Sequence, residues 1–69
     1  MSVSNYALLA GNKLRILIED NYSTQEEFAY DYGLELRTVS RYVNKGINKV
    51  GTIQELSEFF QVPFEEFFK

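Results

Sequence analysis

The sequence predicts an all-α fold, a single compact domain of five helices that spans residues 1–69. Two observations predict it. Apolar residues recur at helical spacing in successive segments, and most of the glycines and the single proline lie at the ends of those segments or between them. With 45% hydrophobic and 16% aromatic residues, the chain has room for one domain and is too apolar to be disordered.

The first predicted helix covers about residues 5–21. Leu14, Leu17 and Ile18 share one face of it at helical spacing. Gly11 weakens the first half of this helix, because glycine lowers helix propensity.

The second predicted helix begins at Thr24 and is short. Thr24 and Glu27 form a capping box, in which the Thr24 hydroxyl accepts from the Glu27 amide and the Glu27 carboxylate reaches back to Thr24. The apolar edge that follows consists of Phe28, Ala29 and Tyr32. Gly33 then supplies a natural stop, since glycine readily adopts a positive φ.

The third predicted helix covers Glu35–Asn44, and its apolar stripe consists of Val39, Tyr42 and Val43. Only the Gly33-Leu34 region separates it from the second helix, so the two helices must meet at a large angle. Residues 24–44 are therefore predicted to form a central helix-turn-helix.

A fourth helix is expected from Val50 to Phe60, with four residues facing inward: Ile53, Leu56, Phe59 and Phe60. Pro63 suits the first turn of a short final helix, because its missing N–H would have no partner there. Three phenylalanines repeat at helical spacing in that segment: Phe64, Phe67 and Phe68.

The composition excludes several classes of function. The chain has no Cys and no His, so disulfides, thiolate metal sites, cysteine nucleophiles and histidine ligands or bases are ruled out. With no phosphate-binding loop and no metal-ligand spacing, we expect no enzyme, no metal and no cofactor. No apolar run is long enough for a membrane span and no signal peptide is recognisable, so we expect a cytoplasmic protein without a membrane or small-molecule partner.

The formal charge of −3 conceals a segregation along the chain. Residues 1–32 carry −3, residues 33–49 carry +3 and residues 50–69 carry −3. The cations of the middle segment are Arg37, Arg41, Lys45 and Lys49. The two arginines lie four residues apart, hence on one face of the third helix, and the lysines would extend this basic band. Phosphate binding needs such a local footprint whatever the net charge, although an ordinary solvated face is the alternative interpretation.

The segment from Thr24 to Phe68, about two thirds of the chain, resembles the phage repressor/Cro-type (XRE-like) helix-turn-helix family. The matching pieces are Gln25-Glu26-Glu27-Phe28-Ala29, then Gly33-Leu34, then Thr38-Val39-Ser40-Arg41-Tyr42. Further along, Ile53, Leu56 and Ser57 match the family's apolar fourth helix, and Gln61-Val62-Pro63-Phe64-Glu65-Glu66-Phe67-Phe68 matches its closing helix. The chain departs from the family at Glu35, where Ser or Thr commonly caps the third helix, and along the loop from Val43 to Val50. The resemblance implies a repressor-like domain whose third helix enters the major groove while the second braces it across the backbone.

Charge pattern and resemblance together mark ten residues for DNA contact: Gln25, Leu36, Arg37, Thr38, Ser40, Arg41, Asn44, Lys45, Asn48 and Lys49. Arg37 and Arg41 are the first candidates, because arginine can bond guanine with two hydrogen bonds. The last four residues are expected to position phosphates, which carries no sequence information. Alternatives stay open: Arg37 pairs with Glu35 or Asp31, Leu36 packs beneath the turn, and Gln25 only accompanies the capping box.

The C-terminal phenylalanines exceed what so small a core obviously needs. They provide a candidate isologous dimer interface formed by Phe59, Phe64, Phe67 and Phe68, unless all four belong to the core. We therefore predict a sequence-specific double-stranded DNA-binding transcriptional regulator, by resemblance a repressor, that binds its operator as a homodimer. The alternatives are a protein-interaction module on the same fold, such as an antitoxin or a phage or mobile-element accessory factor, and the DNA-binding domain of a longer regulator.

Overall fold

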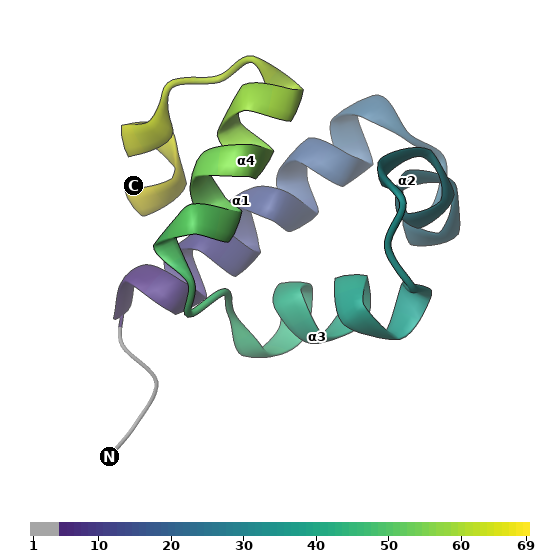
Figure 1. Cartoon of the computed structure of the whole chain (residues 1–69), viewed down its shortest axis with the longest axis horizontal. Coiled ribbons are helices and arrows are strands. Elements are labelled where there is room, and N and C mark those ends of the chain that lie inside the picture. The colour runs from purple at the N-terminus through teal and green to yellow at the C-terminus, as the bar shows by residue number, and fades with distance from the viewer. Residues whose placement is uncertain (1–4) are drawn as a thin grey trace.

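The computed structural model describes residues 5–69, and every regular element within that range is a helix (Figure 1). The elements are α1 (Asn5–Asn21), α2 (Gln25–Tyr32), α3 (Leu36–Lys45), α4 (Val50–Phe60) and the 3-10 helix η1 (Phe64–Phe68). The predicted all-α class is confirmed, but the count of five α-helices is not, because the last segment is a 3-10 helix. Residues 1–4, which the predicted domain 1–69 includes, lie outside the described residues.

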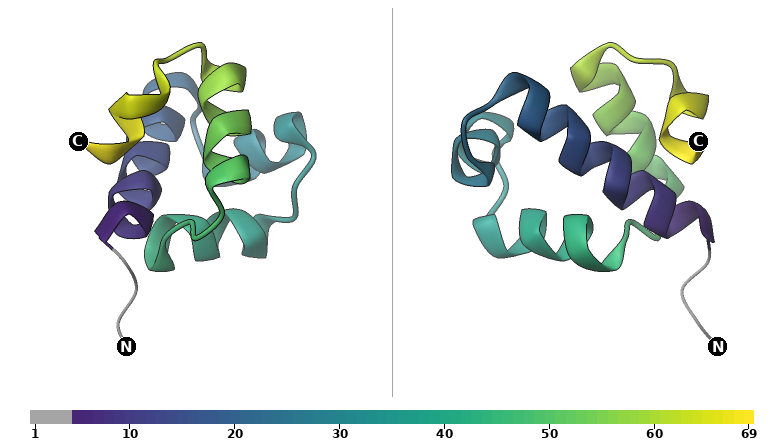
Figure 2. Two further views of the ribbon diagram at one scale, coloured as in Figure 1. Left: turned by 60° about the vertical axis from the view of Figure 1, so that its left-hand side comes forward. Right: turned by 180° about the vertical axis from the view of Figure 1, so that it is seen from behind.

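α1 lies at the centre of the packing. It contacts α3 along one side and η1 along another, with smaller contacts to α2 and α4. Figure 2 shows α1 from behind, running diagonally between α3 and the pair formed by α4 and η1. One core cluster results, and its most buried side chains come from every helix and from the α3–α4 loop: Ala10, Leu14, Phe28, Val39, Ile47, Ile53, Leu56 and Phe67.

α2 begins and ends where the sequence predicts. The Glu27 N–H donates to the Thr24 hydroxyl oxygen at 3.1 Å, which confirms half of the capping box. The other half differs, because the Glu27 carboxylate accepts from the Ser23 N–H at 2.8 Å and not from the Thr24 N–H. Gly33 ends the helix at φ 89°, with its N–H donating to the Ala29 carbonyl at 2.9 Å. A connection of three residues, 33–35, then leads directly into α3.

α1 and the end of α3 approach each other closely at two glycines. A Cβ atom on Gly11 would collide with the backbone carbonyl oxygen of Tyr42. A Cβ atom on Gly46, whose φ is 98°, would lie 2.8 Å from the carbonyl oxygen of Ala7. Gly11, a weak point when judged by helix propensity alone, is thus required by the packing of α1 on α3.

Phe59 lies closer to the surface than its spacing predicts. We expected it to face inward, yet it is 40% exposed. Its ring packs edge-on against Phe28, Tyr32 and Phe60, with centroids 4.8–6.1 Å apart. Phe28 already fills the centre of this cluster, so Phe59 can cover only its outer side.

Phe67 shows the opposite deviation. Proposed as part of a dimer interface, it is fully buried in the core instead. The Glu66 N–H donates to the Pro63 carbonyl at 3.0 Å, and this tight turn directs the Phe67 side chain into the core beside α1. Phe64 and Phe68 remain half-buried, with ring centroids 5.0 Å apart.

Candidate nucleic-acid interface

The outward side of α3 carries many of the residues predicted to touch DNA. Val39 is the buried residue of this helix, and the opposite face consists of Leu36, Arg37, Ser40, Arg41 and Asn44. Leu36 is 42% exposed, so it does not pack beneath the turn. The Asn44 amide donates to the Ser40 hydroxyl at 3.2 Å, which orders two short polar side chains in the middle of this face.

Glu35 precedes α3 without capping it, since its side chain bonds none of the first amides of the helix. Its carboxylate lies 3.5 Å from Nε of Arg37 instead. The two side chains are 75% and 85% exposed, so the pair contributes only about 0–1 kcal/mol. Arg37 can therefore leave Glu35 for a phosphate or a base edge at little energetic cost.

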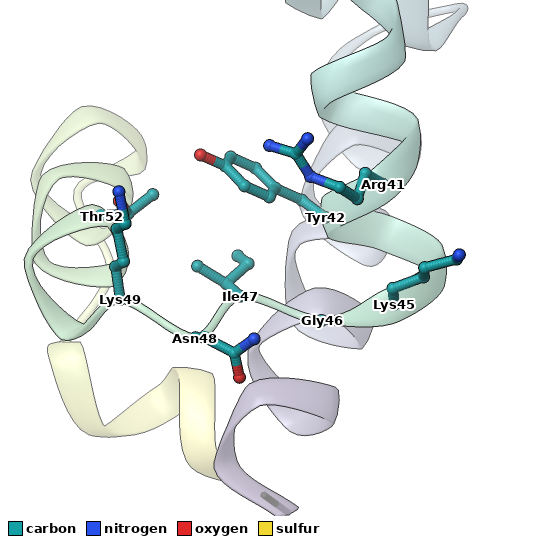
Figure 3. Close-up of a pocket in the computed structure, with 8 residues that line it drawn as sticks. All are labelled: Arg41, Tyr42, Lys45, Gly46, Ile47, Asn48, Lys49 and Thr52. Carbon is teal, nitrogen blue, oxygen red and sulfur yellow. The ribbon is translucent and has the colours of Figure 1, made fainter. Parts of the chain in front are cut away.

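A cavity of about 380 Å³ lies between the end of α3, the following loop and the start of α4 (Figure 3). We call it the basic pocket; its lining is Arg41, Tyr42, Lys45, Gly46, Ile47, Asn48, Lys49 and Thr52. Figure 3 shows the Tyr42 ring reaching across toward α4 with the Arg41 guanidinium beside it, whereas Lys45 points outward. The pocket thus combines an apolar wall with cationic side chains at its edge.

Contacts with α1 fix the loop that carries Asn48 and Lys49. Ile47 is 1% exposed, and its N–H donates to the Ala7 carbonyl at 3.0 Å. The Tyr6 hydroxyl donates to the Asn48 carbonyl at 2.6 Å. The positions of these two polar residues are therefore set by backbone anchors and not by ion pairs.

Within the described part of the chain, the cations of the basic pocket have no acidic partner, unlike Arg15, Arg37 and Lys69. Arg15 lies 3.6 Å from Glu19, and Lys69 lies 3.0 Å from Glu66. Within residues 5–69, no carboxylate lies within 4.0 Å of Arg41, Lys45 or Lys49. Three uncompensated positive charges on one short segment form a local attraction for phosphate in a molecule of net negative charge.

Gln25 and Thr38 do not line the basic pocket. Gln25 is the first residue of α2 and half-buried, and its side chain makes no hydrogen bond to other residues of the described chain, so the capping box does not employ it. Thr38 is half-buried one turn before Tyr42, on the flank of α3 that borders the basic pocket. The structure thus groups Arg41, Lys45, Asn48 and Lys49 around the pocket and leaves Gln25 apart.

The sequence patterns missed four residues that line the pocket: Tyr42, Gly46, Ile47 and Thr52. The apolar stripe of α3 assigns Tyr42 to the core, but its half-buried ring serves the core and the pocket wall together. Thr52 stands in the first turn of α4, three residues after Lys49. A hydroxyl residue placed just behind a basic loop is the signal that could have found it.

The four phenylalanines proposed for a dimer interface do not form one surface. Phe67 is buried, and Phe59 packs with aromatic residues of α2 and α4. Phe64 and Phe68 pack on each other, and Phe68 also contacts Tyr6 with centroids 6.1 Å apart. Only the η1 pair therefore keeps a shared half-exposed position beside α1.

Nothing outside the chain itself identifies this interface. Comparisons with protein-family models, curated proteins and solved structures find no match. In residues 5–69, no group of acidic side chains could hold a metal ion, and no helix is long and apolar enough to cross a membrane. The geometry and charge of α3 and the basic pocket are therefore the basis for a function.

Proposed function

We propose that the protein is a sequence-specific double-stranded DNA-binding regulator that represses transcription, with α3 in the major groove. The observation that carries this proposal is the set of unpaired cations Arg41, Lys45 and Lys49 directly beside the polar outward face of α3. The resemblance of residues 24–68 to phage repressor/Cro-type proteins supports the same assignment. Such a regulator would act on DNA in the cytoplasm.

The shape of α3 suits insertion into a groove. Its ten residues extend over about 15 Å, and the major groove, about 12 Å wide, admits one helix. Ser40 and Asn44 are short, so the helix axis can approach the base edges closely. Arg37 and Arg41 flank them and are long enough to bond guanine.

The basic pocket fits the role of a phosphate clamp next to the groove. Lys45, Asn48 and Lys49 are exposed; Lys45 ends α3, and the anchored loop holds the backbone of Asn48 and Lys49 in place. Contacts of this kind set the register of a protein on DNA without reading sequence.

We further propose that two copies bind one operator, because a single module of this size buries only about 600–1,000 Å² on DNA. The half-exposed rings of Phe64 and Phe68 are the proposed contact between copies. Sedimentation without DNA should show a dimer at high protein concentration. A monomer under those conditions would contradict the homodimer.

Selection of binding sites from a random duplex library tests the function most directly. It should return a defined half-site, repeated with two-fold symmetry if a dimer binds. If about six to eight phosphates are contacted per dimer, the log–log slope of affinity against salt should lie near −5 to −7. Failure to enrich any sequence, together with a flat salt dependence, would refute DNA binding.

A protein-interaction module on the same fold is the second candidate. The acidic segments 1–32 and 50–69 and the 40% exposure of Phe59 favour it. A module of this type should ignore duplex DNA even at low salt, so one binding measurement separates the two candidates.

A further inference from the structure

A second hollow lies at the end of the molecule that faces away from α3. It has a volume of about 390 Å³ and is lined by Asn21, Tyr22, Phe59, Phe60 and Gln61. We call it the C-terminal hollow, because α1 ends at Asn21 and α4 ends at Phe60. In Figure 1, α3 runs along the lower edge, whereas the ends of α1 and α4 lie toward the upper edge. The proposed DNA interface does not include any of its residues.

Two helix C-termini meet at this hollow, and neither is compensated by a basic residue. The last turns of both α1 and α4 lack Lys and Arg. The last carbonyl groups of a helix lack intrahelical donors and carry about half a negative charge together. In the described chain, no backbone N–H bonds the carbonyls of Phe59 or Phe60. At the end of α4 the carbonyls of Phe59 and Phe60 thus remain acceptors without a backbone donor, whereas at the end of α1 the Leu17 and Ile18 carbonyls accept from the Asn21 side-chain amide and the Tyr22 N–H.

Carboxylates add to this negative potential. Asp20 stands in the last turn of α1 and Glu58 in the last turn of α4, and both are exposed. Asp31 accepts a hydrogen bond at 2.6 Å from the hydroxyl of Tyr22, which lines the hollow, so a third carboxylate is bonded to one of the lining side chains.

Aromatic rings form the rest of the wall. Phe60 stacks on Phe28 with centroids 5.5 Å apart, Phe59 packs edge-on to Phe60, and Tyr22 packs edge-on to Phe28. Aromatic faces attract cations through their quadrupole, and more strongly so where water is partly excluded. Rings, free carbonyls and carboxylates together favour a positively charged, planar group.

We propose that the C-terminal hollow binds an arginine side chain presented by a partner protein. A guanidinium stacks on aromatic rings and offers five N–H donors, whereas an ammonium is compact and strongly hydrated. The partner's surface should be basic, since the surrounding segments carry −3 each. Among the arginines of a second copy, Arg37 and Arg41 belong to the proposed DNA interface and Arg15 lies 3.6 Å from Glu19, so the proposed occupant is a partner protein.

N-acetyl-arginine amide, titrated into the isotope-labelled full chain and followed by amide NMR shifts, tests the proposal. Saturable shifts should appear at Asn21, Tyr22, Phe60 and Gln61. N-acetyl-norleucine amide, which has similar length without charge, should bind about five- to tenfold more weakly. Equal affinity of the two probes would overturn the proposal, since the hollow would then be merely apolar.

Asn21→Lys provides the matched variant, because it places a cation in the last turn of α1. It should weaken binding of the arginine probe about five- to tenfold. Asn12→Lys changes the same residue type on the same helix at an exposed position outside the hollow, and should leave binding unchanged. If Asn21→Lys loses helical circular dichroism, Gln61→Lys replaces it.

Two results would refute the site. Equal weakening by Asn21→Lys and Asn12→Lys would mean that the probe binds the acidic surface diffusely. Shifts of the same four amides on raising protein concentration alone would mean that a second copy occupies the hollow.

Discussion

The two ends of the molecule carry opposite charge and are supported in different ways. At the basic end, Arg41 and Lys49 flank a loop whose path is fixed by backbone contacts between Gly46 and α1. At the acidic end, packed rings such as Phe59 and Phe60 form the hollow. A backbone contact tolerates no added atom, whereas a ring cluster tolerates changes that keep its volume. Where a charge sits, and how rigidly it is held, therefore matters more for partner choice than the net charge.

The backbone support of the basic end can be broken with one methyl group. Gly46→Ala should destabilise the fold by about 1–3 kcal/mol or more, because its Cβ meets the Ala7 carbonyl at 2.8 Å and φ is 98°. So small a core is worth only about 3–5 kcal/mol in total, so much of the fold should be lost. Urea unfolding followed by circular dichroism measures this.

Gly51→Ala is the matched control for that substitution. Gly51 lies in the first turn of α4, and a Cβ there meets nothing within 4 Å. Alanine should therefore be neutral or stabilise the protein by up to about 1 kcal/mol. Equal destabilisation by both alanines would show that the loop is not anchored through Gly46.

Arg41→Ala tests whether the charge at the basic end contributes to DNA binding. Arg41 belongs both to the outward face of α3 and to the basic pocket, so its loss should weaken operator binding by about 1–3 kcal/mol. Arg15→Ala removes the same charge from α1, where Glu19 lies 3.6 Å away, and should change affinity far less. Fluorescence anisotropy on the selected duplex measures both; equal losses would indicate a nonspecific charge effect.

The N-termini of α2 and α3 differ in capping, and substitutions there should change stability less than those above. Thr24→Ala removes the cap of α2 and should cost about 1 kcal/mol of unfolding free energy. Glu35→Ser would supply the cap that α3 lacks and should stabilise the protein by about 0.5 kcal/mol. Thermal unfolding of both variants beside Glu26→Ala, an exposed neighbour, shows whether each effect comes from capping.

The protein should lose stability at high pH because of Tyr22 at its acidic end. The hydrogen bond to Asp31, aided by partial burial and by the charge of that carboxylate, raises the pKa of Tyr22 to about 12 from 10.0. Between those values the unfolded chain has lost the proton that the folded chain keeps, so the stabilisation present below pH 10 disappears toward pH 12. Burial, chiefly, also raises the pKa of Tyr32, which adds to the same decline.

Tyr22→Phe should flatten this decline without abolishing it. Tyr30→Phe, at a side chain that is 91% exposed, should leave it unchanged. Unfolding free energies of both variants, measured from pH 9 to pH 12, test this prediction. If the free energy of the Tyr22→Phe protein falls with pH as steeply as that of the unchanged protein, the role of the bond to Asp31 is contradicted.

Local signals were sufficient for much of the fold. The bounds of α1 and α4, the cap at Thr24 and the stop at Gly33 follow from apolar spacing and from backbone preferences that act over a few residues. The last segment differs from what apolar spacing predicts. Phe64–Phe68 is only five residues long and forms a 3-10 helix.

The candidate site could be predicted only in part, because its arrangement depends on packing between residues far apart in the sequence. Apolar spacing alone cannot predict that Phe67 is buried and Phe59 is exposed, because burial depends on which other side chains fill the centre of the core. The need for Gly11 arises from an atom of Tyr42, more than thirty residues later in the chain. The four cations were visible from the sequence, but their division into Arg37, paired with Glu35, and the three around the basic pocket required the fold.

Complete burial of Phe67 has a consequence for how the protein is made. The side chain that closes the core on α1 is supplied by a segment translated after every α-helix. A nascent chain that has emerged only as far as α4 therefore has α3 in place but lacks the Phe67 side chain in its core. Until residue 67 leaves the ribosome, the apolar surface of α1 beneath it stays uncovered, and exposed surface of this kind favours aggregation and chaperone binding.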